Sequence, residues 1–291
     1  MTGVAWVDGA LLSRSEARVS IDDFAVRYGA ACFETMLARH SCVFRLDAHL
    51  DRLEAGLRAM LVEPPARDAL RHAVVATLAA NALTEASVRL TVTAGAGHVP
   101  DLRAASAPSV IVTADPLPPA PASPRLRVVA TRIDAHRPLL AAKSAQFLPY
   151  LLARAEARDA GADDALLLNH DGAIVEAATA NVFLVRDGGI ATPPLADGPL
   201  PGVTRAALIE VAHSLGVPAV ERRLTLNDLA LAEAVLLTSS VAGVLVVASL
   251  VASAPEAPQH LDWHAREPAP ALVAQLRAAY EALVSAETVA G

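Results

Sequence analysis

A proline-rich segment is the feature that most limits how this chain folds. Residues 115–124 read DPLPPAPASP, which places five prolines in ten residues. Proline fixes its own φ angle and has no N–H group to donate, so the segment continues neither a helix nor a central strand. The sequence therefore predicts two domains, a smaller one over residues 1–114 and a larger one over residues 125–291, with 115–124 as the connector.

Both predicted domains mix strand-like and helix-like patterns. Leucines at helical spacing predict a helix over residues 46–61, with Asp47 able to cap it. Residues 164–193 predict three short strands that turn at Asp-Gly pairs. A hairpin is expected over residues 4–12, with its turn at Asp8-Gly9. Further helices are expected over residues 67–80, 147–161, 201–217 and 269–285, and strands over 87–94, 109–114 and 125–133. This alternation predicts an α/β or α+β fold class in two lobes, with a ligand site between them.

Charge and cysteine content exclude several kinds of partner. The net charge is −7, and no basic run interleaves with aromatic residues, so nucleic acid is not expected as a partner. Cys32 and Cys42 fit no metal-ligand spacing, which predicts no bound metal and a reducing cytoplasm. Residues 1–18 lack a basic head followed by an apolar core, so we expect no signal peptide.

One uncharged stretch is long enough to cross a membrane, but its composition favours strands. Residues 234–255 contain no charged side chain over 22 positions. Hydroxyl side chains and a glycine interrupt the stretch. Its two β-branched parts, 234–238 and 244–251, are typical of buried strands around a polar turn. We therefore expect no membrane span here.

Lysine is nearly absent from the sequence. The chain has 23 arginines and a single lysine, Lys143. A GC-rich genome explains the scarcity of lysine but not the exception. Arginine serves as well as lysine at most surface positions, but its guanidinium never deprotonates in a protein and cannot do amine chemistry. We therefore expect that Lys143, which lies between a predicted strand and a helix, is kept for its nitrogen. Chance survival is the alternative.

Several other side chains suit an anionic, nitrogen-containing cofactor. The common signatures of nucleotide, zinc and serine-hydrolase sites do not occur. Thr204 lies at a predicted helix start, where unsatisfied N–H groups favour a phosphate. Residues 238–240 place three hydroxyls in a turn, which is a second candidate phosphate site. Arg52 and Glu176 are further candidates. Taken singly, each also fits a structural role: a hydroxyl bound to local backbone, a solvated arginine or a surface glutamate.

The order of these features resembles the class IV aminotransferases, which are pyridoxal-phosphate (PLP) enzymes of fold type IV. This family includes D-amino-acid and branched-chain transaminases and aminodeoxychorismate lyase. The similar segments are YGAACFETM at 28–36, VFRLDAHLDRL at 43–53, ARDAGADDALLLNHDGAIVE at 157–176, EAATANVFLV at 176–185, GGIATPPLADGPLPGVTR at 188–205 and LLTSSVAG at 236–243. The resemblance runs from about residue 4 to residue 247. It implies a small N-terminal α/β domain and a larger, β-barrel-like C-terminal domain with flanking helices.

The resemblance also implies a role for each matching residue. Lys143 would form the Schiff base with PLP and carry the proton between the substrate Cα and the C4′ carbon of the cofactor. Glu176 would pair with the pyridine nitrogen and keep it protonated, which makes the ring an electron sink. The other implied cofactor-binding residues, which hold the phosphate or lie against the ring, are Arg52, Leu200, Val203, Thr204, Ser239 and Ser240.

The chain departs from the family pattern at three points. Ser239 stands where many members have glycine, which requires a compatible backbone conformation. Leu148 lies five residues beyond Lys143, where branched-chain enzymes place a tyrosine, and this argues against the branched-chain subtype. The Arg-x-His carboxylate clamp of D-amino-acid enzymes is at most half present, because Ala96 precedes His98 by two positions.

The sequence does not decide which residues bind the substrate. Arg89 corresponds in place to a substrate-side arginine of branched-chain members, although a structural role fits it equally. The candidates for the substrate site are Tyr28, Arg89 and His98, with Arg27 and Arg137 as further candidates for a carboxylate contact.

The resemblance implies a cytoplasmic, homodimeric transaminase that moves an amino group from an amino acid, D-amino acids included, or a primary amine to a 2-oxo acid. The dimer is implied because the neighbouring subunit completes the site in this family. Two alternatives stay open. A lyase of the aminodeoxychorismate type would use the same cofactor and lysine for elimination. A degenerate relative would bind PLP, or nothing, and act as a partner protein, although retention of the single lysine argues against it.

Overall fold

The computed structural model describes residues 3–119, 123–137, 139, 141–251, 261–263 and 270–289. The chain forms two compact units. The first comprises Met1–Pro119, Ala142–Gln146 and Val284–Gly291, and the second comprises Ala120–Ala141 and Phe147–Leu283. No sequence pattern indicated that the short segment with Lys143 groups with the first unit. The division into 1–114, 115–124 and 125–291 stays a prediction about domains.

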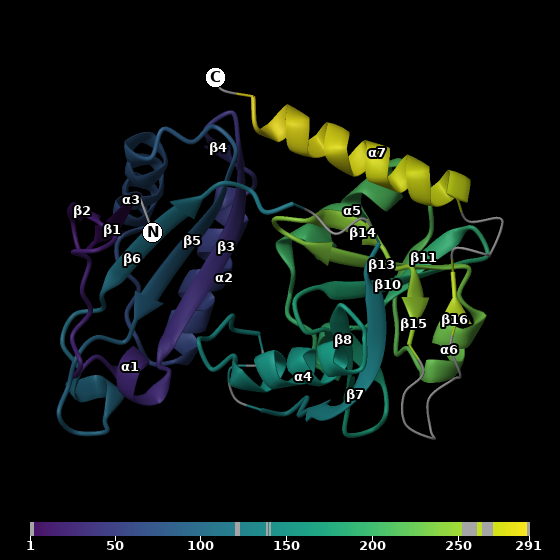
Figure 1. Cartoon of the computed structure of the whole chain (residues 1–291), viewed down its shortest axis with the longest axis horizontal. Coiled ribbons are helices and arrows are strands. Elements are labelled where there is room, and N and C mark those ends of the chain that lie inside the picture. Colours follow the sequence, from purple (N-terminus) through teal and green to yellow (C-terminus); the bar gives the residue numbers. More distant parts are fainter. Residues whose placement is uncertain are drawn as a thin grey trace. The chain divides into compact units, whose positions relative to one another are not determined.

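A six-stranded antiparallel sheet forms the body of the first unit (Figure 1). Its strands lie in the order β2-β1-β6-β5-β3-β4. Their bounds are β1 Val4–Val7, β2 Ala10–Ser13, β3 Ala31–Arg39, β4 Cys42–Val43, β5 Ala86–Thr93 and β6 Val110–Asp115. The expected hairpin at 4–12 is confirmed as β1 and β2. Strand β3 was not expected, because almost all of its residues are buried and it lacks the alternation that marks a half-buried strand.

Two helices cover one face of this sheet. Helix α2 (Leu46–Ala59) packs on β3, and α3 (Arg67–Ala80) packs on β1, β5 and β6. The face beneath them is apolar, and alternate residues of β5 that point into it, from Val88 to Val92, are fully buried. Two short elements complete the unit, α1 (Phe24–Tyr28) and a 3-10 turn at Leu102–Ala104.

The start of α2 differs from the expectation that Asp47 caps it. Arg45 occupies the N-cap position with a left-handed backbone and makes no side-chain capping bond. Asp47 lies within the first turn, where a negative charge still stabilises the positive end of the helix. Its carboxylate instead bonds Arg71 of α3.

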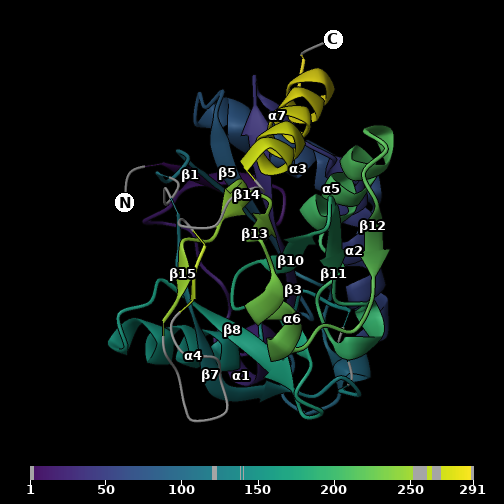
Figure 2. The same ribbon diagram turned by 90° about the vertical axis from the view of Figure 1, so that its right-hand side faces the viewer.

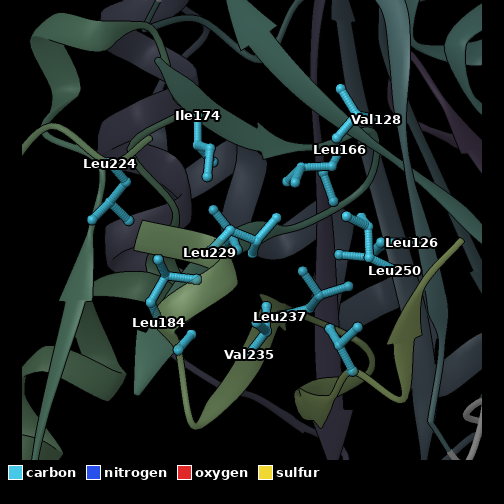
Figure 3. Packing of buried hydrophobic residues seen from close by; sticks show 14 of the residues in the cluster. Leu126, Val128, Leu166, Ile174, Leu184, Leu224, Leu229, Val235, Leu237 and Leu250 are labelled. Atoms are coloured by element: carbon cyan, nitrogen blue, oxygen red, sulfur yellow. The ribbon is translucent and has the colours of Figure 1, made fainter. Parts of the chain in front are cut away.

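Two five-stranded sheets enclose the main core of the second unit. Their strand orders are β12-β11-β10-β13-β14 and β16-β15-β7-β8-β9. Side chains of both sheets form one hydrophobic cluster, which includes Leu166 and Ile174 from one sheet and Leu184 and Leu237 from the other (Figure 3). The strand bounds are β7 Arg125–Ile133, β8 Asp164–Asn169, β9 Ile174–Ala177, β10 Asn181–Arg186, β11 Gly189–Thr192, β12 Ala219–Glu221, β13 Ala234–Ser239, β14 Gly243–Val246, β15 Ser249–Leu250 and β16 Leu261–Asp262.

Helices flank these sheets. Helix α4 (Leu148–Asp159) connects the parallel strands β7 and β8 and packs on both. It buries Tyr150, Ala153 and Ala157 in a second apolar cluster together with Leu167 of β8. Helix α5 lies beside β12 and β13 (Figure 2). The remaining helical bounds are α5 Val203–Ser214, α6 Leu226–Leu231, α7 Pro270–Glu287 and a 3-10 turn at Leu195–Asp197.

The strand-rich half differs from the sequence-based expectation in two respects. Residues 164–193 contain four strands instead of three, because the small residues 178–180 interrupt the run between β9 and β10. The uncharged stretch that begins at residue 234 forms three strands, β13, β14 and β15, where two were expected, because the expected strand at 244–251 divides into β14 and β15. The last residues of this stretch, 252–255, lie outside the described part. Among the described residues, no helix is both long and apolar enough for a bilayer.

Candidate active site

The backbone of Lys143 is bound to the edge of β3. Strand β4 pairs with the last two residues of β3, Ala38 and Arg39. A different segment of the chain, which includes Lys143, lies along the first residues of β3. The N–H of Phe33 donates to the carbonyl oxygen of Lys143 at 2.9 Å, and the N–H of Ala145 donates to that of Ala31 at 2.8 Å. These hydrogen bonds add the segment 142–146 to the sheet, so the position of Lys143 follows from the strand.

Helix α2 lies close to Ala142, the residue before Lys143, at the position of Gly56. A Cβ atom on Gly56 would lie 3.0 Å from Sγ of Cys32 and 3.1 Å from Cβ of Ala142. A larger residue would therefore push the helix away from this segment. Burial, and then the negative charge of Glu34, raise the pKa of the Cys32 thiol to about 12. Cys32 thus packs as an apolar side chain, because a thiol needs to ionise before it acts as a nucleophile.

The side chain of Lys143 shares an aromatic ring with Arg89. Nζ of Lys143 lies 4.9 Å from the centroid of the Phe33 ring, and the guanidinium carbon of Arg89 lies 3.9 Å from it. Both distances are typical of cation–π contacts. Arg89 as a whole is exposed, but partial burial of its guanidinium on the ring lowers its pKa below the ordinary value. The first unit therefore brings an amine and a guanidinium together over one ring.

Arg52 lies in a buried ion-pair cluster. Its Nε and Nη2 donate to the two carboxylate oxygens of Glu34 at 2.8 and 2.5 Å, and Nδ1 of His49 lies 2.7 Å from Oε2 of Glu34. The side chains of Arg52, His49 and Glu34 are 9 %, 1 % and 0 % exposed. Burial alone would raise the pKa of Glu34, but the charge of Arg52 and the hydrogen bonds from both partners lower it to about 2. A solvated Arg52 is thus excluded, and Glu34 sets the plane of its guanidinium.

Three further candidates lie at the surface of the first unit. Tyr28 ends α1 and is 46 % exposed, with the guanidinium carbon of Arg27 lying 5.3 Å from its ring centroid. Nη1 of Arg27 donates to the carbonyl oxygen of Gly97 at 2.7 Å, and His98 follows in the same exposed loop. The structure therefore brings Tyr28 and Arg27 together beside the loop that carries His98.

Both carboxylate oxygens of Glu176 are bound in the second unit. Glu176 lies on β9, is 6 % exposed, and pairs with Leu167, so both point to the face that α4 covers. Oε1 accepts a hydrogen bond from the hydroxyl of Tyr150 at 3.0 Å. Oε2 accepts from the N–H of Leu200 at 3.0 Å and from Nδ2 of Asn181 at 3.3 Å. The surface role that a glutamate at a strand end suggests is excluded, because this carboxylate is buried and oriented.

The loop before α5 is clamped to the same strand residues. Nδ2 of Asn181 also donates to the carbonyl oxygen of Leu200 at 2.9 Å. Gly202, the N-cap of α5, comes so close that a Cβ atom there would lie 1.9 Å from Oδ1 of Asn181. Glycine is therefore required at 202 unless Asn181 moves, and this close approach sets the start of α5 beside the strand.

The start of α5 and the end of β13 suit a phosphate. Gly202, the N-cap of α5, lies against Asn181, and Asn181 pairs with Thr238 near the end of β13. Helix α5 begins at Val203 without a side-chain cap, so its first N–H groups have no capping acceptor. Thr204 lies in this first turn and is 3 % exposed. At the end of β13, Oγ1 of Thr238 is buried without a hydrogen-bond partner among the described residues, and half-buried Ser239 and Ser240 follow. A buried hydroxyl in this state is able to donate a hydrogen bond to an oxyanion that enters from outside.

Arg137 does not lie at the surface as an isolated cation. Its Nη2 donates to the hydroxyl of Tyr150 at 2.8 Å, and its guanidinium carbon lies 5.6 Å from the centroid of the Tyr150 ring. Its described partner is therefore the tyrosine that bonds Glu176.

Four residues that orient the candidate site were not expected from the sequence: Glu34, His49, Asn181 and Tyr150. The first three lie inside the quoted family-like segments. A charged or amide side chain within an apolar run was the signal that could have found them, because a buried polar group needs a partner. Tyr150 lies outside those segments, and only the packing of α4 reveals its contact.

Comparison with known proteins identifies the family. The sequence model of the family described as amino-transferase class IV matches residues 31–250. A putative branched-chain-amino-acid aminotransferase of Methanocaldococcus jannaschii is 32 % identical over 249 residues, which are 83 % of this chain and 86 % of the relative. The chain belongs to the class IV aminotransferases. It is therefore an enzyme that uses PLP.

Solved structures agree with this assignment. A branched-chain aminotransferase from Thermoproteus uzoniensis is similar with a TM-score of 0.86 at 28 % identity, covering 99 % of this chain and 96 % of that one. A 4-amino-4-deoxychorismate lyase from Pseudomonas aeruginosa is similar with a TM-score of 0.79 at 33 % identity, covering 94 % and 97 %. The expected fold type IV architecture is confirmed.

The described residues fit this cofactor. PLP presents a phosphate, which suits the unpartnered hydroxyl of Thr238 and the N–H groups at the start of α5. It also presents a pyridine nitrogen, which suits the buried and oriented carboxylate of Glu176.

Proposed function

We propose that this enzyme is a transaminase that moves an amino group between an amino acid and a 2-oxo acid, with Lys143 as the residue that carries PLP. Bound PLP supplies an electron sink for negative charge that develops at the substrate Cα. The amine of Lys143 moves the proton between that carbon and C4′ of the cofactor. The observation that carries the proposal is the placement of the chain's single lysine, bound to β3 and beside a guanidinium over Phe33.

The other proposed cofactor contacts are to the pyridine nitrogen, to the ring and to the phosphate. Glu176 holds the proton on the pyridine nitrogen, and its fixed orientation supports this role. Leu200, whose N–H orients Glu176, contacts the ring. The proposed phosphate ligands are Arg52, Val203, Thr204, Ser239 and Ser240. The uncapped start of α5 supports this set, because a helix N-terminus favours a phosphate.

We assign the substrate carboxylate to Arg89. A guanidinium binds a carboxylate through two parallel hydrogen bonds, and that of Arg89 shares the Phe33 ring with the amine of Lys143. An amino acid, with its carboxylate next to its amino group, is thereby favoured over a simple amine. Replacement of Arg89 by Gln is expected to raise KM for amino acids more than for amines, and an equal effect on both would contradict the assignment. Tyr28 and His98 stay candidates for the rest of the substrate.

The identity of the donor is the finer part of the proposal. The Methanocaldococcus jannaschii relative makes branched-chain L-amino acids the first donors to test. D-amino acids remain in the proposal, because Leu148 replaces the tyrosine of branched-chain enzymes. A panel of D- and L-amino acids and amines, mixed with the holoenzyme and followed by cofactor absorbance, separates these donors. If none of the amino acids changes the absorbance, the proposed transfer is wrong.

We also propose a cytoplasmic homodimer in which the neighbouring subunit completes the site. The resemblance to the family supports it, and so do three exposed leucines on α4, Leu148, Leu151 and Leu152, which are 63 %, 54 % and 59 % exposed. Sedimentation equilibrium tests the dimer. A monomer with full activity would contradict it.

The lysine is tested by chemical trapping. Borohydride reduction of the holoenzyme is expected to leave the cofactor covalently bound to the peptide that contains Lys143, as read by mass spectrometry. Lys143→Arg, which keeps the positive charge, is the matched variant and is expected to lose about 10²–10⁴-fold in turnover. An unlabelled Lys143, or a Lys143→Arg variant with normal turnover, would overturn the proposal.

Elimination is the second candidate function. The observation that favours it is the 33 % identity to the 4-amino-4-deoxychorismate lyase from Pseudomonas aeruginosa. Release of pyruvate from aminodeoxychorismate, without conversion of the cofactor to its amine form by amino acids, would identify a lyase. The opposite pair of results would identify the transaminase.

A further inference from the structure

A chain of hydrogen bonds leads from Arg137 through Tyr150 to Glu176. Nη2 of Arg137 lies 2.8 Å from the hydroxyl oxygen of Tyr150, and that oxygen lies 3.0 Å from Oε1 of Glu176. A guanidinium only donates and an ionised carboxylate only accepts, so the direction of both bonds is set. The phenol oxygen accepts a hydrogen bond from Arg137, and its O–H donates one to Glu176.

The surroundings of Tyr150 hold the phenol in this position. Tyr150 is 8 % exposed and packs among the alanines of α4 and the strands beneath it. The ring of Phe147 stacks on it with centroids 4.9 Å apart and planes at 8°. Burial, and then the negative charge of Glu176, raise the pKa of Tyr150 above its ordinary value, so the hydroxyl stays protonated at neutral pH.

We propose that Tyr150, polarised by Arg137, is a positioning residue that holds Glu176 ionised and correctly oriented for the pyridine nitrogen of PLP. Leu200 and Asn181 donate to Oε2, and Tyr150 donates to the other oxygen, Oε1. Hydrogen bonds to the charged form of a carboxyl group favour that form. An adjacent guanidinium strengthens the phenol as a donor, because hydrogen bonds in series polarise one another. The proposal depends on the cofactor role proposed above for Glu176.

Tyr150→Phe tests this step, because it removes one oxygen and keeps the ring. We expect the affinity of the apoenzyme for PLP, measured by equilibrium dialysis, to fall about 10- to 100-fold, which is the usual effect of losing a hydrogen bond to a charged group. The pH titration of the bound cofactor's absorbance is expected to shift, because Glu176 would hold the ring proton less firmly. Tyr280→Phe removes another buried phenol and is the matched control, with unchanged affinity and titration.

A double-mutant cycle separates positioning from simple packing. If Tyr150 acts through Glu176, Tyr150→Phe changes PLP affinity less than about twofold in a Glu176→Gln background, because coupled residues are not additive. An equal loss in both backgrounds, or no loss in either, would overturn the proposal. Arg137→Gln leaves α4 intact and is expected to give a smaller effect in the same direction. Wild-type affinity in that variant would overturn the part assigned to Arg137.

The result for Glu176→Gln alone distinguishes a failure of the positioning role of Tyr150 from a failure of the cofactor role of Glu176. If that variant binds PLP with normal affinity and gives a normal titration, the assigned role of Glu176 is wrong. If it weakens PLP binding while Tyr150→Phe does not, Glu176 keeps its role and only the positioning by Tyr150 is wrong.

Discussion

Two buried glutamates, one in each unit, are held in opposite ways. Glu34 of β3 accepts hydrogen bonds from the guanidinium of Arg52 and from the ring of His49. The described hydrogen bonds to Glu176 of β9 come from three uncharged donors, a phenol, a side-chain amide and a backbone N–H. A guanidinium neutralises the carboxylate that it binds, whereas uncharged donors orient a carboxylate without neutralising it.

The difference in described donors predicts a structural role for Glu34 and a role in cofactor chemistry for Glu176. The charge of Glu34 is used within the fold, since Glu34 holds Arg52 of α2 against β3. The described donors to Glu176 fix its direction without adding a positive charge, which suits the role proposed for Glu176 beside a protonated ring nitrogen. Loss of Glu34 is therefore expected to affect stability first, and loss of Glu176 to affect cofactor chemistry first. The following changes test this contrast.

The largest expected effect is the loss of stability in Glu34→Gln. The change removes the carboxylate that pairs with the buried guanidinium of Arg52, and breaking a buried ion pair in this way costs about 3–5 kcal/mol of unfolding free energy. Denaturant unfolding followed by circular dichroism measures it. A loss below about 1 kcal/mol would show that Arg52 finds another partner and that Glu34 does not anchor it.

Glu176→Gln is expected to reduce turnover about 10²–10³-fold, as the loss of a preorganised charge does in other active sites. Its unfolding free energy is expected to fall less than that of Glu34→Gln, because a neutral amide oxygen still accepts hydrogen bonds from neutral donors. Steady-state kinetics and the same unfolding assay compare the two variants directly. If both variants lose stability equally and turnover equally, the contrast between the two glutamates is wrong.

Acid is expected to act on the fold through Glu34. Its folded pKa of about 2 lies below the value of 4.5 for a free glutamate, so its contribution is complete above pH 4.5 and is lost as the pH falls toward 2. The shift corresponds to about 3 kcal/mol of stability. Unfolding free energies measured between pH 6 and pH 3 are expected to decline less steeply in Glu34→Gln than in the wild type. Parallel curves would place the acid sensitivity elsewhere.

The smallest expected effect comes from an ion pair at the surface. Arg71 of α3 bonds Asp47 of α2, and their side chains are 38 % and 60 % exposed. Water and salt screen such a pair, so Arg71→Ala is expected to change the unfolding free energy by at most about 0.5 kcal/mol. The change in unfolding free energy of Arg71→Ala, measured in low and high salt, shows how much an exposed ion pair contributes and is the reference for Glu34→Gln. If Arg71→Ala lost as much unfolding free energy as Glu34→Gln, burial would not explain why the Arg52–Glu34 pair stabilises the fold more than a surface pair.

Local patterns predicted much of the fold. The leucine spacing of 46–61 and the Asp-Gly turn at residues 8 and 9 led to α2 and to the first hairpin, because helix periodicity and tight turns depend on neighbours in the chain. Strand β3 was missed because it is buried on both faces. Its neighbour across the sheet, β5, begins some fifty residues later in the chain. No local period reports a partner at that separation.

The candidate site divides in the same way. The single lysine and the hydroxyls at 238–240 were visible as residue types in unusual places, and their roles stay proposals. The partners that orient Arg52 and Glu176 were not visible. Glu34 is 18 positions from Arg52, and Tyr150 is 26 positions from Glu176, so only a packed helix on a strand joins them.

The sequence alone determined the class of this enzyme, because the order of its local segments resembles the class IV aminotransferases and the family's sequence model matches residues 31–250. The tertiary structure decided how the two buried carboxylates differ. Whether a glutamate meets a guanidinium or a phenol depends on which helix packs over its strand, and that choice is made by burial of apolar side chains far away in the chain.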